Sequence, residues 1–215
     1  MYWSRRRTQM LDDKSLLVGV KALAKSDPHL RKVVDQYGPP PLWDRDPGFP
    51  SLLKIILEQQ VSLASAQATY DKLLSKTNPL TPESLLRLND DELKSVGLSR
   101  QKTRYVRILA EAIFSESLDL DELKHFEDEV VMNSLTSLTG IGPWTAGIYL
   151  LMVLRRPDVW PRGDLALLSA LRDVKGLECV PSNDEATKIA DNWRPWRSVA
   201  ARILWHHYLS ERGRS

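Results

Sequence analysis

Residues 138–168 read LTGIGPWTAGIYLLMVLRRPDVWPRGDLALL, and this stretch decides the fold expected for the rest of the chain. Gly140 and Gly142 flank Ile141 in a tight turn, where glycine can take positive φ and leaves the backbone open to close approach. Pro143 follows at once, and proline suits the first position of a helix because its φ is already helical and its missing N–H is not needed there. The stretch therefore predicts a turn between two helices, the second of which begins at Pro143.

The same turn predicts a backbone site for an anion. The free N–H groups of the turn and of the new helix point outward at the positive end of the helix dipole, where phosphate binds. A glycine pair alone is weak support, because a plain corner between two helices uses the same residues. Both interpretations of the glycine pair stay open at this point. Further along, Asp164 stands in RGDL at 162–165, directly before an apolar helical run.

Four blocks of sequence resemble the helix-hairpin-helix DNA glycosylase superfamily (HhH-GPD), and they occur in the family's order. They are ILEQQVSLASAQA at 56–68, GLSRQKTRYV at 97–106, GIGPWTA at 140–146 and NWRPWRS at 192–198. The local details look most like the alkylation-repair branch, the AlkA-type 3-methyladenine DNA glycosylases II. The resemblance extends over most of residues 50–208.

This resemblance implies an all-α fold in two lobes, with the active-site cleft between the lobes. Residues 1–45 would supply N-terminal helices that pack with the C-terminal lobe. Residues 50–155 would form a helical barrel lobe that contains the helix-hairpin-helix at about 127–153, and residues 160–215 would complete the second lobe. The proline-rich segment 37–50 is predicted to be an extended crossing between lobes.

Helical periodicity dominates the chain, with no alternating β pattern and no repeat. Asn89 with Glu92, and Ser182 with Glu185, have the spacing of capping boxes, while Gly97 stands where a helix should stop. The helices predicted from periodicity span residues 16–24, 28–36, 50–60, 63–76, 82–88, 90–96 and 100–115.

Composition sets limits on the class of protein. The 215 residues can bury a real core, and a net charge of +2, from 30 basic and 28 acidic residues, does not by itself indicate DNA binding. The single cysteine, Cys179, excludes a disulfide framework, a zinc cluster of cysteines and a four-cysteine iron–sulfur cluster, and it favours a reducing, intracellular compartment. The four histidines lack metal-ligand spacing, so no transition metal is expected.

The start of the chain, MYWSRRRTQM, has no apolar core of signal-peptide length, and no later run approaches a membrane span. Arg5, Arg6 and Arg7 suit either phosphate contact or a solvated tail, and we assign them no function. The expected place of the protein is inside the cell with the DNA, in the cytoplasm or nucleoid of a prokaryote or the nucleus of a eukaryote.

Asp164 is the predicted catalytic residue. Breaking an N-glycosidic bond develops positive charge on the sugar, and a fixed carboxylate would stabilise that charge and orient the attacking water. The alternative is that Asp164 only caps the helix of residues 165–173, because aspartate is a favoured cap residue. The two roles are compatible, since both use an ionised carboxylate.

Trp144 occupies the hairpin position where glycosylases that also cut the strand carry a lysine. The missing amine predicts a monofunctional hydrolase that leaves an abasic site and has no AP-lyase activity. Trp144 and Trp196 resemble the pocket aromatics of the family, and indole faces suit the cationic ring of an alkylated purine. Ile148 stands where enterobacterial-type members have tyrosine, so one wall of the pocket is less aromatic. The remaining indoles considered, assigned to structural roles, are Trp43, Trp160, Trp193 and Trp205.

Gln59 and Gln60 resemble the loop that the family inserts into the duplex, and Gln60 best matches the wedge position. A solvated helix end explains Gln60 equally well. Glu58 replaces a glycine that is frequent before this pair, so the local backbone is expected to differ.

Phosphate contacts are expected mainly from the backbone of the hairpin, with nearby cations helping. In related hairpins backbone carbonyls also hold a monovalent cation that positions the turn without a catalytic task, and no cofactor is otherwise required. The residues predicted to bind DNA here are Gly140, Ile141, Gly142 and Thr145 of the hairpin, with Arg100, Lys102, Arg104, Arg107 and Arg197 as cations; Thr136, Leu138 and Ile141 would hold the Na⁺ or K⁺.

Together these features predict a monofunctional DNA glycosylase that flips alkylated purines of the 3-methyladenine and 7-methylguanine type out of double-stranded DNA and hydrolyses their N-glycosidic bond in base excision repair. It would act as a monomer without an obligate protein partner or a membrane. Two alternatives remain: a glycosylase of this scaffold for deaminated or oxidised bases, and a non-catalytic helix-hairpin-helix module that only binds DNA.

Overall fold

The computed structural model describes residues 10–213, which divide into two compact units. One unit is Arg45–Tyr149, and the other combines residues 10–44 with residues 150–213. The first division lies inside the proline-rich segment 37–50, which carries no helix between residues 38 and 48. The described residues form helices and no β-strand, which confirms the all-α prediction. Arg5, Arg6 and Arg7 lie outside the described residues.

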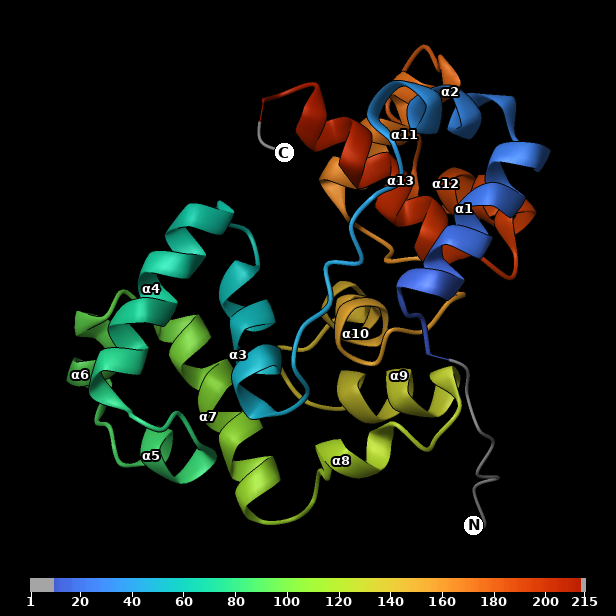
Figure 1. The fold of residues 1–215 in the computed structure, drawn as a ribbon. Coiled ribbons are helices and arrows are strands. Elements are labelled where there is room, and N and C mark those ends of the chain that lie inside the picture. Colours follow the sequence, from blue (N-terminus) through green and yellow to red (C-terminus); the bar gives the residue numbers. More distant parts are fainter. Residues whose placement is uncertain (1–9, 214–215) are drawn as a thin grey trace. The chain divides into compact units, whose positions relative to one another are not determined.

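The Arg45–Tyr149 unit is built around α3 (Phe49–Glu58), whose Leu52, Leu53, Ile55 and Ile56 are fully buried. A helix that is apolar nearly all round belongs in the centre of a unit. Both α4 and α7 pack on α3, and α10 packs on α9 and α3 (Figure 1). The other helices of this unit are α4 (Leu63–Lys76), α5 (Pro82–Leu86), α6 (Asp90–Ser95), α7 (Arg100–Phe114), α8 (Leu120–Leu123), α9 (Asp128–Thr136) and α10 (Pro143–Ile148).

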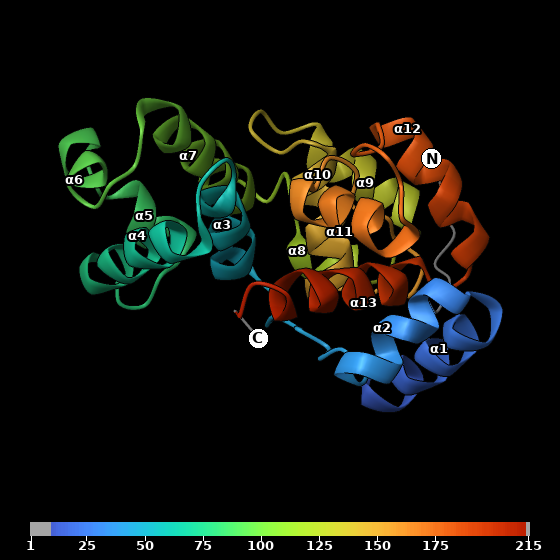
Figure 2. The ribbon, with the colours of Figure 1, turned by 90° about the horizontal axis from the view of Figure 1, so that it is seen from above.

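The second unit is built around α13 (Arg197–Ser210), in which Val199, Ala200, Ile203 and Leu204 are fully buried. Helices α1, α2 and α11 pack against α13 (Figure 2). The other elements are α1 (Asp13–Ser26), α2 (Pro28–Tyr37), α11 (Leu165–Lys175), α12 (Asn183–Ala190) and the 3₁₀ turn η2 (Asp191–Trp193); a short π-helix, η1 (Tyr149–Val153), begins at the division between the units.

A buried arginine is part of the core of this second unit. The guanidinium of Arg202 donates to the carbonyls of Leu42 at 2.7 Å, Leu151 at 2.8 Å and Ser198 at 3.1 Å. Burial lowers the pKa of Arg202 to about 10. A buried charge is tolerated only when its donors are satisfied, and here three carbonyls satisfy them. The guanidinium of Arg202 thereby links the segments that contribute these carbonyls.

Helix ends follow the predicted capping residues. Asn89 with Glu92 and Ser182 with Glu185 form the two predicted capping boxes, and Gly97 takes φ of 105° just after α6. The predicted end of α3 at Gln60 is wrong: the helix stops at Glu58, because Gln59 is extended and Gln60 takes φ of 57°. Among the described residues, no helix combines the length and the apolar character needed to cross a membrane.

Candidate DNA interface and active site

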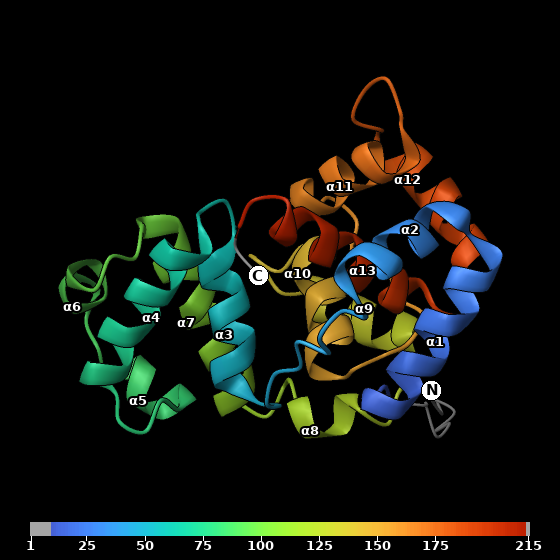
Figure 3. The same ribbon diagram turned by 45° about the horizontal axis from the view of Figure 1, so that its top comes forward.

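The hairpin turn joins α9 to α10 within the Arg45–Tyr149 unit (Figure 3). Gly140 takes φ of 99°, and a Cβ at this position would lie 2.2 Å from Cγ of Tyr105 on α7. Glycine is therefore required for two independent reasons, the left-handed backbone and the close approach of a ring. Tyr105 belongs to the block at 97–106, so this block contacts the hairpin turn through an aromatic ring.

Gly142 differs from the prediction. Its φ of −90° and ψ of 177° are ordinary extended values, and a Cβ built on it meets no atom within 4 Å. Gly142 is the N-cap of α10, and no side chain caps this helix start. The backbone is thus open to an approaching group at Gly142, as a phosphate contact requires. The N–H of Ile141 is not part of that surface, because it donates to the carbonyl of Leu138 at 3.1 Å.

The carbonyls predicted to hold a monovalent cation lie at the end of α9 and in the turn. Thr136 is the last residue of α9, and the carbonyl of Leu138 accepts one hydrogen bond, from Ile141. A carbonyl oxygen has two lone pairs, so Leu138 retains acceptor capacity for an ion. The oxygen donors present fit a hard monovalent cation, and its binding there stays a prediction.

Residues 59–62, which we call the wedge loop, connect α3 to α4. Gln60 is exposed with its backbone in the left-handed region, and next to it Val61 is 45% exposed. Leu63, in the first turn of α4, is 65% exposed. The hydroxyl of Ser62 accepts from the N–H of Ser65 at 3.2 Å and caps α4. The polar Gln60 is therefore followed by two exposed apolar side chains, Val61 in the loop and Leu63 at the start of α4.

Gln59 is turned inward, contrary to the predicted DNA contact. Its side-chain amide donates to the carbonyl of Gly140 and to the hydroxyl of Thr145, both at 2.8 Å. Thr145 is only 1% exposed and its hydroxyl accepts from Gln59, so its side chain is occupied within the unit, and its contact with DNA stays a prediction. Both residues serve the packing of the hairpin against the wedge loop.

Lys102 and Arg197 were predicted to contact phosphate, and the structure uses both internally. The ammonium of Lys102 donates to the carbonyl of Leu57 at 2.5 Å, near the end of α3, and burial lowers its pKa. Arg197 is 15% exposed and donates to the carboxylate of Asp158, at 2.9 Å from Nε, and to its carbonyl at 2.8 Å. An acidic neighbour occupies this guanidinium, so it is not a cation for DNA here.

Of the remaining predicted cations, two on α7 stay available for contact with phosphate. Arg100 and Arg104 are exposed, and neither guanidinium takes part in a hydrogen bond or ion pair with another of residues 10–213. Arg107, in contrast, donates to Asp90 at 2.7 Å and to the carbonyl of Leu88. Arg100 and Arg104 are thus the members of the set that can meet phosphate without breaking another contact.

Asp164 is the N-cap of α11 in the second unit. Its Oδ1 accepts from the N–H of Leu167 at 2.8 Å and from the indole Nε1 of Trp205 at 3.2 Å. Both partners are N–H donors, which an ionised carboxylate accepts well. Trp205 was assigned a purely structural role from the sequence. No local signal could have revealed the contact, because these two residues meet only through the packing of α13 on α11.

The loop before Asp164 is also fixed. Gly163 takes φ of 86°, and its N–H donates to the side chain of Asn183 at 2.9 Å. Arg162 pairs with Asp184 at 2.7 Å. The start of α12 therefore holds the turn that delivers the carboxylate to the start of α11.

The predicted base-pocket residues fall in different units. Trp144 and Ile148 lie on α10 in the Arg45–Tyr149 unit, while Trp196 lies in the second unit. Both indoles are half-buried, and Ile148 is 3% exposed. Trp196 packs on α1, where a Cβ on Gly19 would lie 2.8 Å from its ring. That these residues share one pocket with Asp164 stays a prediction.

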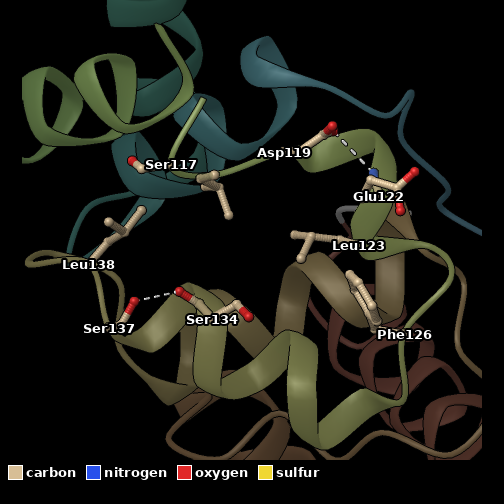
Figure 4. A pocket seen from close by; sticks show the side chains of 9 residues that line it. Ser117, Asp119, Glu122, Leu123, Phe126, Ser134, Ser137 and Leu138 are labelled. Carbon is tan, nitrogen blue, oxygen red and sulfur yellow. Dashed lines mark hydrogen bonds between the residues drawn. The ribbon is translucent and has the colours of Figure 1, made fainter. Parts of the chain in front are cut away.

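A cavity of about 280 Å³ opens in the Arg45–Tyr149 unit beside the first helix of the hairpin (Figure 4). Leu123 and Phe126 give it an apolar side, while Asp119 caps α8 and Ser137 donates to the carbonyl of Ser134. None of the predicted catalytic or base-pocket residues lines it. This cavity is therefore separate from the predicted chemistry.

Comparison with known proteins places these features in a family. The family described as "HhH-GPD superfamily base excision DNA repair protein" matches residues 53–195. A putative DNA-3-methyladenine glycosylase of Bacillus subtilis (strain 168) is 26% identical over 214 residues, covering 90% of this chain and 75% of that protein. The structure of a Schizosaccharomyces pombe 3-methyladenine DNA glycosylase in complex with abasic DNA aligns with a TM-score of 0.81 and 25% identity, covering 87% of this chain and 95% of that one. A DNA-3-methyladenine glycosidase from Bacillus halodurans aligns with a TM-score of 0.76 and 28% identity, over 97% and 95% of the two chains.

Proposed function

The chain belongs to the HhH-GPD superfamily of base excision DNA repair proteins, and from this membership we propose that it is a monofunctional DNA glycosylase for alkylated purines. The observation that carries the proposal is the fixed carboxylate of Asp164, which caps α11 and accepts from Trp205. Relatives that match most of the chain are named for 3-methyladenine, and this supports the substrate class.

The chemistry follows from what a carboxylate does beside a deoxyribose. As the glycosidic bond lengthens, the sugar becomes cationic, and Asp164 stabilises that charge and orients the attacking water. A base alkylated on a ring nitrogen is itself cationic and leaves readily, so acid assistance is little needed. Trp144 and Trp196 stack on the flipped base and attract its charge through their ring faces.

Binding to double-stranded DNA uses different residues. The open backbone at Gly142 receives a phosphate, and Arg100 and Arg104 add attraction from α7. Gln60 enters the space that the flipped nucleotide leaves. The protein acts as a monomer wherever the cell keeps its DNA, and a monovalent cation held by the carbonyls of Thr136, Leu138 and Ile141 would steady the turn.

The test is base release from methylated duplex DNA, followed by chromatography of the free bases. We expect 3-methyladenine and 7-methylguanine to appear and the strand to stay intact until it is heated in alkali. Borohydride should trap no covalent complex, because Trp144 replaces the amine that would form a Schiff base. Asp164→Asn should keep the helix cap but lose turnover; full activity in that variant would remove Asp164 from the reaction.

A panel of duplexes, each with a single lesion, separates this proposal from its alternatives. Release of only deaminated or oxidised bases would reassign the specificity on the same scaffold. Salt-sensitive duplex binding without any base release would indicate a non-catalytic DNA-binding module.

A further inference from the structure

We infer that Gln59 is a positioning residue that locks the wedge loop onto the hairpin turn. The inference rests on the proposed function, because it explains how such a glycosylase keeps its wedge in place. One amide nitrogen reaches two acceptors, the carbonyl of Gly140 in the turn and the hydroxyl of Thr145 in α10, each at 2.8 Å. A single side chain therefore ties the loop to both parts of the hairpin.

The two residues before Gln59 are fixed by other partners. The carboxylate of Glu58 is 7% exposed and pairs with Arg45 through two bonds of 3.0 Å each. The carbonyl of Leu57 accepts from Lys102 of α7 at 2.5 Å. Fork-to-fork pairing of arginine with a carboxylate fixes orientation as well as distance. Three consecutive residues are thus held from three directions: the segment before α3, α7 and the hairpin.

After Gln59 the side chains become exposed to solvent. Gln60, Val61 and Leu63 are exposed, and Gln60 adopts a left-handed backbone that a non-glycine residue takes only when its surroundings impose it. The anchored residues 57–59 supply that constraint on one side, and the Ser62 cap of α4 supplies it on the other. The wedge loop is thus a short exposed tip that follows the anchored residues 57–59.

A firmly anchored wedge loop matters for the flipping of a nucleotide. A wedge must stand in for a stacked nucleotide while the hairpin holds a phosphate, so the distance between the two has to be fixed. The Gln59 bonds link these two elements directly, within one unit of the protein. Without them, the loop can bend away from the duplex, although the carboxylate that does the chemistry is untouched.

The experiment compares Gln59→Met, which keeps the length of the side chain but removes its donors, with Gln67→Met on α4. Gln67 donates to Asp71 at 2.7 Å on the exposed side of the same unit and provides a matched loss of one amide. Excision of 7-methylguanine is measured at single turnover from a duplex and from the same strand without its complement, which needs no wedge. Fluorescence of 2-aminopurine beside the lesion reports flipping.

We expect Gln59→Met to slow duplex excision by about 10-fold or more and to reduce the 2-aminopurine signal, while single-strand excision stays within about twofold. Gln67→Met should match the wild type on both substrates. Thr145→Val should reproduce part of the loss and add little to Gln59→Met in the double variant, since both remove the same contact. Thr145→Ser, which keeps the hydroxyl, should restore duplex excision.

Equal losses on duplex and single strand, or no loss on either, would overturn the inference. If the wild type releases no base from any substrate, the proposed function fails, and affinity for an abasic duplex then decides the role of Gln59. In that case, equal affinities of Gln59→Met and Gln67→Met for the abasic duplex would overturn the inference. A loss of affinity in Gln59→Met alone would support it.

Discussion

The indole Nε1 of Trp205 donates to Oδ1 of Asp164 at 3.2 Å, and the same oxygen accepts the backbone N–H of Leu167 at 2.8 Å. The carboxylate is thus oriented both by its own helix and by a residue of α13. The backbone bond is available to any N-cap aspartate. The indole bond depends on how α13 packs on α11, which makes Trp205 a positioning partner for the proposed reaction.

Replacing Trp205 should therefore slow base release without weakening DNA binding. In Trp205→Phe the carboxylate loses one charged hydrogen bond, and we expect the single-turnover rate to fall about 5- to 50-fold. Affinity for an abasic duplex should be unchanged. Trp160→Phe removes an equally buried indole of the same unit and should leave the rate near that of the wild type. A loss of similar size in both variants would point to a general packing effect.

The two glycines of the hairpin should respond differently to the same substitution. Gly140→Ala forces a side chain into the left-handed region and against Tyr105, and we expect it to cost about 2–4 kcal/mol of unfolding free energy. Gly142→Ala meets no neighbour and should cost less than about 1 kcal/mol, while its methyl group obstructs the approach of a phosphate.

Urea denaturation measures the cost of each glycine substitution, and duplex affinity measures the effect on the turn. We expect Gly142→Ala to be nearly as stable as the wild type but weaker in DNA binding. If Gly140→Ala is as stable as Gly142→Ala, the close approach of Tyr105 does not constrain the turn.

Salt dependence should separate the cations that meet DNA from those that hold the fold. Arg100→Gln should reduce the slope of log affinity against log salt by about 1, because one phosphate contact is lost. Arg197→Gln should leave the slope unchanged and lower the unfolding free energy by about 1–3 kcal/mol, because Asp158 then loses its less exposed cation and keeps only Arg194, at 3.0 Å. Arg100→Lys is the control that keeps the charge. A change of slope in Arg197→Gln alone would reverse the assignment.

Acid should weaken the second unit through Asp27. Its Oδ2 accepts from Lys175 at 2.6 Å and from the indole of Trp193 at 2.8 Å. Burial by itself raises the pKa of Asp27, but the bonds from Lys175 and Trp193 outweigh it, so the pKa lies below its ordinary value. A carboxylate with a depressed pKa stabilises the fold above the unfolded value of about 3.9, and this stability is lost as the pH falls through the folded value.

Asp27→Asn should therefore be less stable than the wild type by about 2–4 kcal/mol near neutral pH, because Lys175 loses its counter-ion. The difference should shrink as the pH falls through and below about 4, where the wild type also loses the charge. Urea denaturation followed over this pH range checks both statements. A difference that does not change with pH would show that the charge of Asp27 is not what stabilises the unit.

Local chemistry explains which features of the fold were predictable. The start of α10 follows from Pro143, the stop after α6 from Gly97, and the two capping boxes from residues three positions apart. Each depends on contacts within a few residues. The end of α3 was mispredicted because the left-handed backbone of Gln60 comes from anchors distant in sequence, such as Thr145 and Lys102.

The same distinction applies to the candidate site. Sequence alone determined the residue types: a glycine turn and an aspartate at a helix start follow from order and spacing, and the resemblance to the family implies that Trp144 stands where a lysine would. Only the tertiary structure decided which polar side chains remain available. It turned Gln59 and Arg197 inward and gave Asp164 an indole partner, since a hydrogen bond between distant segments forms only once their helices have packed.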